Sequence, residues 1–411
     1  MTLAAVPVSQ PDVSVSRADI ASVRGRLWSY QARYASFFGR RELRRHARTY
    51  LRGLLSDEPR KSIERMVLRQ QGADPNAVRT QQLFLRTARW EDAPILAAHR
   101  KLVAATLGGD EGVLAIDGTD IPKDGVESVG VARQYCGQLG KRANCQAAVY
   151  AAYLGCGAAA LVDRRLYLSQ DWVSGASHAA RRRRTGVPEG IPFRTKPQLA
   201  LDMLSGLVAE GTLPVRWVTC DEGFGHSHAF LDGVADLGLG YLAEVPRTTH
   251  VWTTRPERTG GPPSRPVFSA PSQPVGAVAD RLPRAAWRPF ILREGSKGPQ
   301  AVLCAVLRVA ARRGPEPGPD VWLLLRRHPA TDELKVYLSN GPAEMPAERL
   351  VWLAGLRWPI EQCFRDGKQL FGLGDYEGRS WQGWHRHATL VMLAHFFVVR
   401  ETLRLKKSTP A

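Results

Sequence analysis

Three acidic residues stand far apart in this chain at positions where carboxylates could hold metal ions. Asp117 follows the apolar run 113–116, Asp221 follows the run 216–220, and Glu361 opens a stretch with helical periodicity. Mg²⁺ prefers carboxylate oxygens and keeps waters or phosphate oxygens at its remaining positions. Two such ions ~3.5–4 Å apart can activate a water or 3′-hydroxyl and stabilise the leaving oxygen of a phosphodiester. Brought together, these acids would suit phosphoryl transfer, whereas each alone could equally be a turn former or helix cap.

The two aspartates belong to a region whose pattern predicts a sheet. Residues 216–220 and 241–245 read as strands, and a helix is expected between them at about 227–237, so these two strands should be parallel. In open α/β sheets, sites form where neighbouring strands end. If the strands that precede Asp117 and Asp221 are adjacent, their carboxylates converge.

The third acid lies on a predicted helix that Pro359 begins, since proline fits the first helical turn. Glu361 sits in that first turn, Lys368 lies two turns on along the same face, and Arg365 lies between them. Three apolar residues at helical spacing would face a core: Ile360, Phe364 and Phe371. A solvated face of charged residues is the alternative interpretation.

Composition limits the partners and the number of folding units. A chain of 411 residues exceeds one compact core, so two or three units are expected. The net charge of +18 indicates a polyanionic partner, with nucleic acid first and a membrane surface as the weaker alternative. Six cysteines without a CxxC pair, no signal peptide and no run long enough to span a bilayer favour a cytoplasmic, nucleoid-associated protein without a membrane.

Residue composition and apolar periodicity change at several points along the chain, and these changes predict how it divides into parts. The expected parts are a polar tail at 1–20, a helical domain at 21–110, a sheet core at 111–246, a Pro- and Gly-rich insertion with β content at 247–343, a second part of the core with the glutamate helix at 344–405, and a tail at 406–411.

The helical domain contains the outline of a helix-turn-helix. A helix at 61–71, a turn at Gly72, and a helix capped by Asp74 and Pro75 follow one another. The second helix carries polar residues that could read DNA, although ordinary helical bundles share this outline. They are Arg79, Gln81, Gln82 and Arg86. The arginine run 181–184 is expected to form a basic loop that faces solvent or phosphate.

Several longer segments resemble one known family. The spacing of Arg357, Glu361 and Lys368 matches the R-E-K part of the Y-R-E-K signature of DDE insertion-sequence transposases, and the wider sequence is similar to the insertion sequence 701 branch. The matching segments are 116–119, 128–135 through 144–146, 163–168, 219–225, and 376–381 through 383–387. The resemblance covers roughly residues 40–397.

The resemblance implies a ribonuclease H-like core with a mixed sheet, interrupted by the β-rich insertion before the glutamate helix. It assigns Asp117, Asp221 and Glu361 to a catalytic triad that holds two Mg²⁺ (or Mn²⁺) ions. It also implies DNA contacts along the terminal repeats. The candidate DNA-binding residues are Arg357, Lys368, Arg365, Arg133 and Lys141.

The function expected from the resemblance is DNA transposition by strand cleavage and strand transfer. The partners would be double-stranded DNA with terminal inverted repeats and target DNA, bound by a homodimer. A domesticated nuclease and an inactive DNA-binding repressor are the alternatives. Two positions depart from the family pattern, because Ala354 stands where the signature has tyrosine and Gly118 stands where related enzymes often carry a second acid. A tryptophan of the insertion could receive a flipped base. The candidates are Trp252, Trp287 and Trp322.

Overall fold

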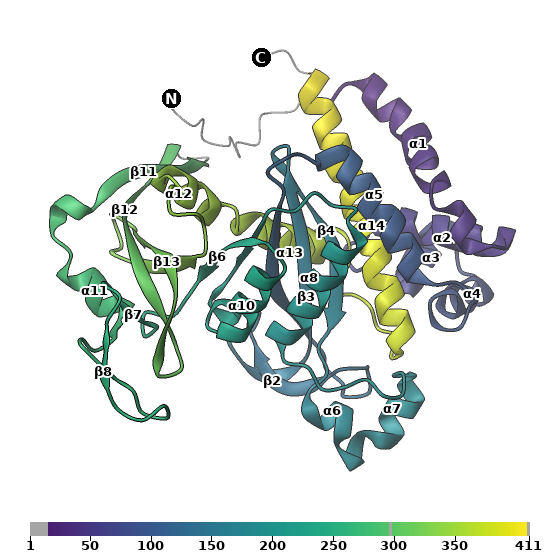
Figure 1. Ribbon diagram of the computed structural model, residues 1–411. Helices are drawn as coiled ribbons and strands as arrows, with labels where there is room; N and C mark the ends of the chain where they lie inside the picture. The colour runs from purple at the N-terminus through teal and green to yellow at the C-terminus, as the bar shows by residue number, and fades with distance from the viewer. Residues whose placement is uncertain (1–14, 296–297, 409–411) are drawn as a thin grey trace. The chain divides into compact units, whose positions relative to one another are not determined.

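The chain is a mixed α/β protein with a large mixed sheet, which confirms the predicted fold class at that level. The computed structural model describes residues 15–295 and 298–408 (Figure 1). These residues form two compact units, each assembled from separate segments. The first unit contains residues 110–117 and 214–358, and the second contains residues 15–109, 118–213 and 359–408.

Three parallel strands lie at one side of the sheet in the first unit. They are β1 (Val113–Pro122), β5 (Trp217–Cys220) and β6 (Gly240–Glu244). Ile116 pairs with Cys220, and Cys220 pairs with Ala243, so β5 and β6 end at nearly the same level, whereas β1 continues past Ile116 to Pro122. β1 belongs to the first unit up to Asp117 and to the second unit from Gly118 onward. The apolar runs predicted as buried strands therefore form neighbouring strands whose core residues are fully covered.

The rest of the first unit is largely an antiparallel extension of this sheet. From β6 the order continues through β14, β13, β12, β7 and β10, with β11 beside β12. The bounds are β14 (Leu334–Ser339), β13 (Glu316–Arg327), β12 (Gly298–Arg313), β7 (His250–Trp252), β10 (Gln273–Pro274) and β11 (Arg288–Gly295). Figure 1 shows β12 and β13 as a long twisted hairpin. The three strands expected at 301–312, 321–327 and 333–339 are thus confirmed, with longer first and second members.

Short elements complete the first unit. They are α9 (Glu222–Gly225), α10 (His228–Asp236), α11 (Val275–Arg281), η3 (Arg284–Ala286), α12 (Ala347–Gly355) and the small hairpin of β8 (Arg258–Gly260) and β9 (Val267–Phe268). Because α10 connects β5 to β6, the predicted βαβ arrangement is confirmed.

The second unit has an antiparallel sheet of its own strands. β3 (Lys141–Gly155) pairs with β2 (Ala132–Cys136) on one side and with β4 (Ala158–Leu166) on the other. The connection at Gly155–Gly157 turns as predicted, and Gly157 has φ 71°, which glycine adopts without strain. α8 (Lys196–Glu210) packs against β3 and β4, and its N-terminus is closed by a capping box from Thr195.

Helices from both ends of the chain build the core of the second unit. The long helix α14 (Trp381–Ser408) packs against β4 and three N-terminal helices, as Figure 1 shows. The three are α2 (Arg41–Leu54), α4 (Pro75–Arg86) and α5 (Asp92–Leu107). The unit also contains α1 (Arg17–Ala32), η1 (Ala35–Phe38) and α3 (Ile63–Gln71). The buried hydroxyl of Tyr30 donates to the carbonyl of Leu393 at 2.8 Å.

Two local predictions are corrected. α1 begins at Arg17, so the last residues of the expected polar tail are helical, while residues 1–14 of that tail lie outside the described residues. The last helix was expected from about Ala388 and begins at Trp381. Within the described residues, no helix is both long and apolar enough to cross a bilayer.

The arginine run 181–184 is helical, where a loop was expected. It belongs to α7 (Ala179–Thr185), which follows α6 (Gln170–Ser174) and η2 (Ala176–His178). Arg182 donates to the carbonyls of Trp172 (2.9 Å) and Gly175 (3.1 Å). These bonds tie the run back to the preceding helix, so this arginine is a structural residue.

Candidate active site

Asp117 and Asp221 stand side by side at the carboxyl edge of the parallel strands. Each directly follows a residue of the paired row, since Ile116 and Cys220 are register partners. Asp117 is 8% exposed, and Asp221 is half-buried at the N-cap of α9. Asp221 follows the last residue of β5 as the sequence predicted, whereas the prediction that Asp117 ends its strand is wrong, because β1 continues to Pro122. The pairing of β1 with β5 still places both carboxylates at one level of the sheet.

Glu244 is a third carboxylate beside Asp117 and Asp221, and the sequence analysis missed it. These three residues are called the acidic row below. Glu244 ends β6 immediately after Ala243, the register partner of Cys220. Its Oε1 accepts from Lys335 Nζ on β14 at 3.1 Å. The signal was present in the sequence, because Glu244 follows an apolar strand run in the same way as the two aspartates do.

Arg357 lies among these acids in the first unit. Its Nη1 is 3.9 Å from Asp117 Oδ2, and its Nε is 3.5 Å from Glu244 Oε2. The side chain is only 19% exposed, so these attractions are screened less than those of a surface pair. The residue predicted to contact DNA thus also serves as the counter-ion of the acidic row.

The carboxylates of the acidic row outnumber the positive charges beside them. Burial raises the pKa of Asp221 and the carboxylate of Glu244 raises it further, while Arg357 and two backbone N–H groups oppose the rise. Asp221 Oδ1 and Glu244 Oε2 are buried oxygens that accept no hydrogen bond from any residue the structure describes. Buried carboxylate oxygens without donors are costly unless a cation reaches them. The oxygen chemistry of this row therefore fits Mg²⁺ or Mn²⁺.

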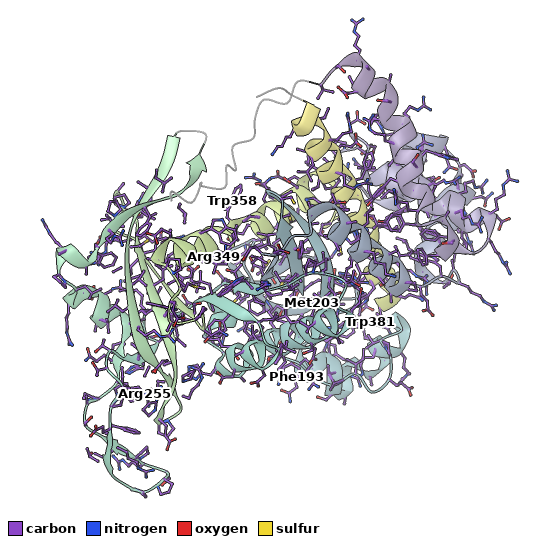
Figure 2. All side chains as sticks on the ribbon, turned by 45° about the horizontal axis from the view of Figure 1, so that its top comes forward. Phe193, Met203, Arg255, Arg349, Trp358 and Trp381 are labelled. Carbon is purple, nitrogen blue, oxygen red and sulfur yellow. The ribbon has the colours of Figure 1, made fainter. Side chains whose placement is uncertain are left out.

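Glu361 lies in the second unit, in the first turn of α13 (Trp358–Leu370). Trp358, labelled in Figure 2, is the last residue of the first unit, so α13 begins where the chain passes between the units. Ile360 and Phe364 are buried, and so is Phe371 just beyond the helix, which confirms the predicted apolar face. Within residues 15–295 and 298–408, no three side chains of His, Cys, Asp or Glu lie together as a metal-ligand group. The meeting of Glu361 with the two aspartates stays a prediction.

Lys368 and Asp120 each make polar contacts within the second unit. Lys368 Nζ donates to the backbone carbonyl of Asp120 at 3.1 Å and to Gln138 Oε1 at 3.2 Å. The carboxylate of Asp120 accepts from Gly137 N at 3.0 Å and lies 3.6 Å from Lys196 Nζ. Asp120 therefore has its own cation and backbone donor.

The other predicted DNA contacts are exposed cations of the second unit. Arg133 and Lys141 lie on the hairpin of β2 and β3, and Arg365 lies on α13, where it donates to the side-chain oxygen of Gln362. Exposed cations are available to phosphates. Their contacts with DNA stay predictions.

The three candidate tryptophans differ in their surroundings. Trp252 is 4% exposed and donates to the carbonyl of Ala270 at 2.9 Å, which is the pattern of a core residue. Trp322 is half-buried and donates to the carbonyl of Pro342 at 2.8 Å. Trp287 is also half-buried, with the guanidinium of Arg327 4.6 Å from its ring centroid. Trp322 and Trp287 keep part of their rings accessible for stacking.

Three further residues singled out in the sequence are structural. Gln81 of α4 is 1% exposed and donates to the carbonyl of His46 at 3.1 Å, so the prediction that it could read DNA is wrong. His387 is buried, shares a 2.8 Å hydrogen bond with Tyr50, and has its pKa lowered to about 3 by burial. Ala354, at the signature tyrosine position, is 4% exposed in α12 and packs in the core.

Two comparisons show which known proteins the chain is similar to. The family described as DDE superfamily endonuclease matches residues 33–299, a segment that includes Asp117 and Asp221 and ends before Glu361. A probable transposase for insertion sequence element IS701 from Microchaete diplosiphon is 27% identical over 168 residues. That alignment covers 41% of this chain and 40% of the relative, so the chain spans less than half the length of this curated protein.

Proposed function

Because the chain belongs to the DDE superfamily of endonucleases, we propose that it is the transposase of an insertion sequence. It cuts DNA at terminal inverted repeats and joins the ends to target DNA. The observation that carries this proposal is the pair Asp117 and Asp221, which directly follow the paired residues Ile116 and Cys220 of adjacent parallel strands, with Arg357 beside Asp117. This is the arrangement that metal-dependent phosphoryl transfer requires of its first two carboxylates.

Asp117, Asp221 and Glu361 are the residues that would hold the metal ions. The buried, donor-free oxygen of Asp221 supports this assignment. When bound, two Mg²⁺ or Mn²⁺ ions supply charge stabilisation for both the attacking and the leaving oxygen. Arg357 balances the charge of Asp117 and Glu244. Lys368 and Arg365, on the helix of Glu361, would hold backbone phosphates near the cut.

The proposed function gives each part of the chain a role. Residues 111–246 and 344–405 form a ribonuclease H-like catalytic core, and residues 247–343 form its β-rich insertion. Residues 21–110 bind the terminal repeats through α3 and α4, whose helix–turn–helix is capped by Asp74 and Pro75. The active form on DNA is a homodimer that pairs two ends, with Arg133 and Lys141 as further phosphate contacts.

Substitution of the three acids tests the proposal. Asp117→Ala, Asp221→Ala and Glu361→Gln should each abolish Mg²⁺-dependent cleavage of a duplex carrying the inverted repeat that bounds the gene, while binding of that duplex persists. Asp236→Ala, which removes an exposed acid at the end of α10, is the matched control and should cleave normally. Cleavage retained by any of the three variants would remove that residue from the catalytic set.

Product analysis separates the alternatives. A transposase gives joined products in which the cut end is linked to target DNA, whereas a domesticated nuclease gives cleavage alone. A repressor would bind the repeat and leave it uncut at every Mg²⁺ or Mn²⁺ concentration. Any result other than joined product from the wild-type protein would replace the proposed function by one of these two.

A further inference from the structure

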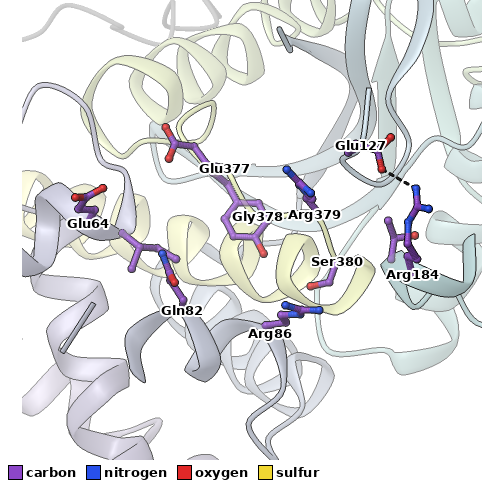
Figure 3. Close-up of a pocket in the computed structure, with 12 residues that line it drawn as sticks. Glu64, Gln82, Arg86, Glu127, Arg184, Glu377, Gly378, Arg379 and Ser380 are labelled. Atoms are coloured by element: carbon purple, nitrogen blue, oxygen red, sulfur yellow. Dashed lines mark hydrogen bonds and ion pairs between the residues drawn. The ribbon is translucent and has the colours of Figure 1, made fainter. Parts of the chain in front are cut away.

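A pocket of about 540 Å³ opens within the second unit, and its lining includes none of Asp117, Asp221 and Glu244 (Figure 3). Its walls come from α3 and α4, from α7, and from the loop that precedes α14. Arg86 and Gln82 of α4 and Arg379 and Ser380 of the loop line it. Pockets of this volume hold small ligands or single groups of larger ones.

The charges in and around this pocket leave two guanidinium groups without acidic partners. Glu127 accepts from Arg184 at 2.8 Å and also has Arg181 3.7 Å away. Glu377 is paired with Arg60 at 2.6 Å. In the part of the chain that the structure describes, neither Arg86 nor Arg379 has an ion pair, and both are exposed. Figure 3 shows both side chains at the same opening. The lining itself holds three arginines and three glutamates, and the excess of positive charge comes from Arg60 and Arg181, which pair with two of these glutamates from outside the lining.

The loop that carries Arg379 is held firmly. The carbonyl of Arg379 accepts from Val129 N at 3.0 Å, and the carbonyl of Tyr376 accepts from Lys123 Nζ at 2.7 Å. Tyr376 is buried and its ring stacks on His387 with centroids 5.0 Å apart. A Cβ at Gly378 would collide with the phenol of Tyr376. Such a fixed backbone holds the guanidinium and the loop amides ready for one ligand geometry.

The start of α14 adds to the attraction for an anion. Ser380 caps this 28-residue helix, since its Oγ accepts from Gly383 N at 3.1 Å. The positive end of a helix dipole favours negative charge in the first turn. Together with two unpaired arginines and a cavity, this end completes an anion-binding site.

The exposed face of α4 runs into the same pocket. Arg79, Gln82 and Arg86 are exposed at helical spacing, whereas Gln81 turns inward to His46. A duplex lying along this face would bring its backbone to the pocket mouth. The ligand that fits the charge, the volume and the neighbouring helix is a phosphodiester.

We propose that this pocket binds one backbone phosphate of duplex DNA, with Arg86 and Arg379 as its charged donors and Gln82 and Ser380 as its neutral ones. The proposal rests on the proposed function, because DNA is taken as the substrate, and deepens it by naming a phosphate anchor outside the catalytic row. Arginine suits this role since its fork of N–H groups matches phosphate oxygens.

Salt dependence of binding to a random-sequence duplex tests the anchor without requiring the correct repeat. Each lost phosphate contact should reduce the slope of log K against log salt concentration by about 0.9 and weaken binding roughly tenfold. Because both arginines are proposed to bind the same phosphate, Arg86→Ala with Arg379→Ala should lower the slope by about 0.9. Arg216→Ala, which removes an exposed arginine of the first unit before β5, is the matched control and should leave the slope unchanged.

A second variant is expected to bind DNA more tightly than wild type, a result that misfolding would not produce. Glu64 lines the pocket, is exposed and has no ion-pair partner within residues 15–295 and 298–408, so Glu64→Gln should tighten binding severalfold. The proposal is overturned if the double arginine variant keeps the wild-type slope, or if single-stranded RNA or inorganic phosphate competes better than the duplex. Absent cleavage by the wild-type protein, with the predicted slopes, would instead refute the transposase function alone.

Discussion

Three buried histidines should make the second unit sensitive to acid. His99, His387 and His395 are at most 4% exposed. Burial lowers the pKa of His99 and His395 to about 4 and that of His387 to about 3, because an imidazolium would lose its hydration. Among the described residues, His99 Nδ1 and His395 Nδ1 have no hydrogen-bond partner, so no acceptor awaits a second ring proton there, whereas the backbone of Leu373 and Gly372 partly offsets the effect of burial on the pKa of His387.

The sign of the effect follows from the folded pKa values lying below the unfolded value of about 6.5. Above pH 6.5 both states are neutral and the stability is fully present. As the pH falls through 6.5 the unfolded chain binds protons that the folded unit refuses, and stability is lost until the folded pKa values near 4 and 3 are reached. From pH 7 to pH 5 each histidine costs about 2 kcal/mol, so the three together cost about 6 kcal/mol. This loss is comparable to the whole stability of a typical domain.

Urea unfolding of the full chain at pH 7, 6 and 5 measures this loss, and His395→Leu provides the critical variant. It replaces a histidine that packs edge-on against Phe371, and it should recover about 2 kcal/mol of the loss. His226→Gln changes an exposed histidine and should recover nothing. A free energy of unfolding that changes by less than about 1 kcal/mol between pH 7 and 5, or a His395→Leu variant as acid-sensitive as wild type, would refute the reasoning.

Two further predictions concern single contacts. Arg386 is fully buried and donates to the carbonyls of Leu85 (2.9 Å), Ala88 (2.7 Å) and Trp90, so Arg386→Ala should cost about 3 kcal/mol and lower Tm by roughly 6–12 °C in calorimetry. Arg400→Ala, on the same helix, should change Tm by less than about 2 °C, and equal effects would contradict the assignment. Glu244→Gln weakens the hold on Arg357 and should slow cleavage about tenfold at unchanged DNA affinity, whereas an unchanged single-turnover rate would count against that role.

Much of the sheet was predictable because strand ends are marked by a change in residue type. The run before Asp221 is one case, since β5 ends at Cys220, whereas the polar residue Asp117 failed as an end signal because β1 continues to Pro122. Asp74 and Pro75 likewise mark the start of α4, where Asp74 Oδ1 accepts from Asn76 N at 2.9 Å. Local rules suffice where the signal lies within a few residues.

The features that sequence reasoning missed depend on distant partners. Gln81 appears polar and exposed in the helical pattern, but His46 supplies its hydrogen bonds inside the core. The arginine run is helical because carbonyls of the preceding segment accept from Arg182. Glu244 carries the local signal of an acid after an apolar run, but its place beside Asp221 comes from the pairing of β5 with β6. No property of a short window reports these pairings, and the position of Glu361 relative to the aspartates depends on the longest-range arrangement of all.

The packing of α14 against the N-terminal helices has a consequence for biosynthesis. Tyr30 and Tyr50 need Leu393 and His387 as hydrogen-bond partners, and the end of α4 needs Arg386. The N-terminal helices are synthesised first, so their apolar faces stay uncovered until residues of α14 emerge from the ribosome exit tunnel. A nascent chain that stops before α14 would leave these faces open to chaperones and proteases. Translation thus completes the helices that are proposed to bind DNA only after the segment that carries Glu361 has been made as well.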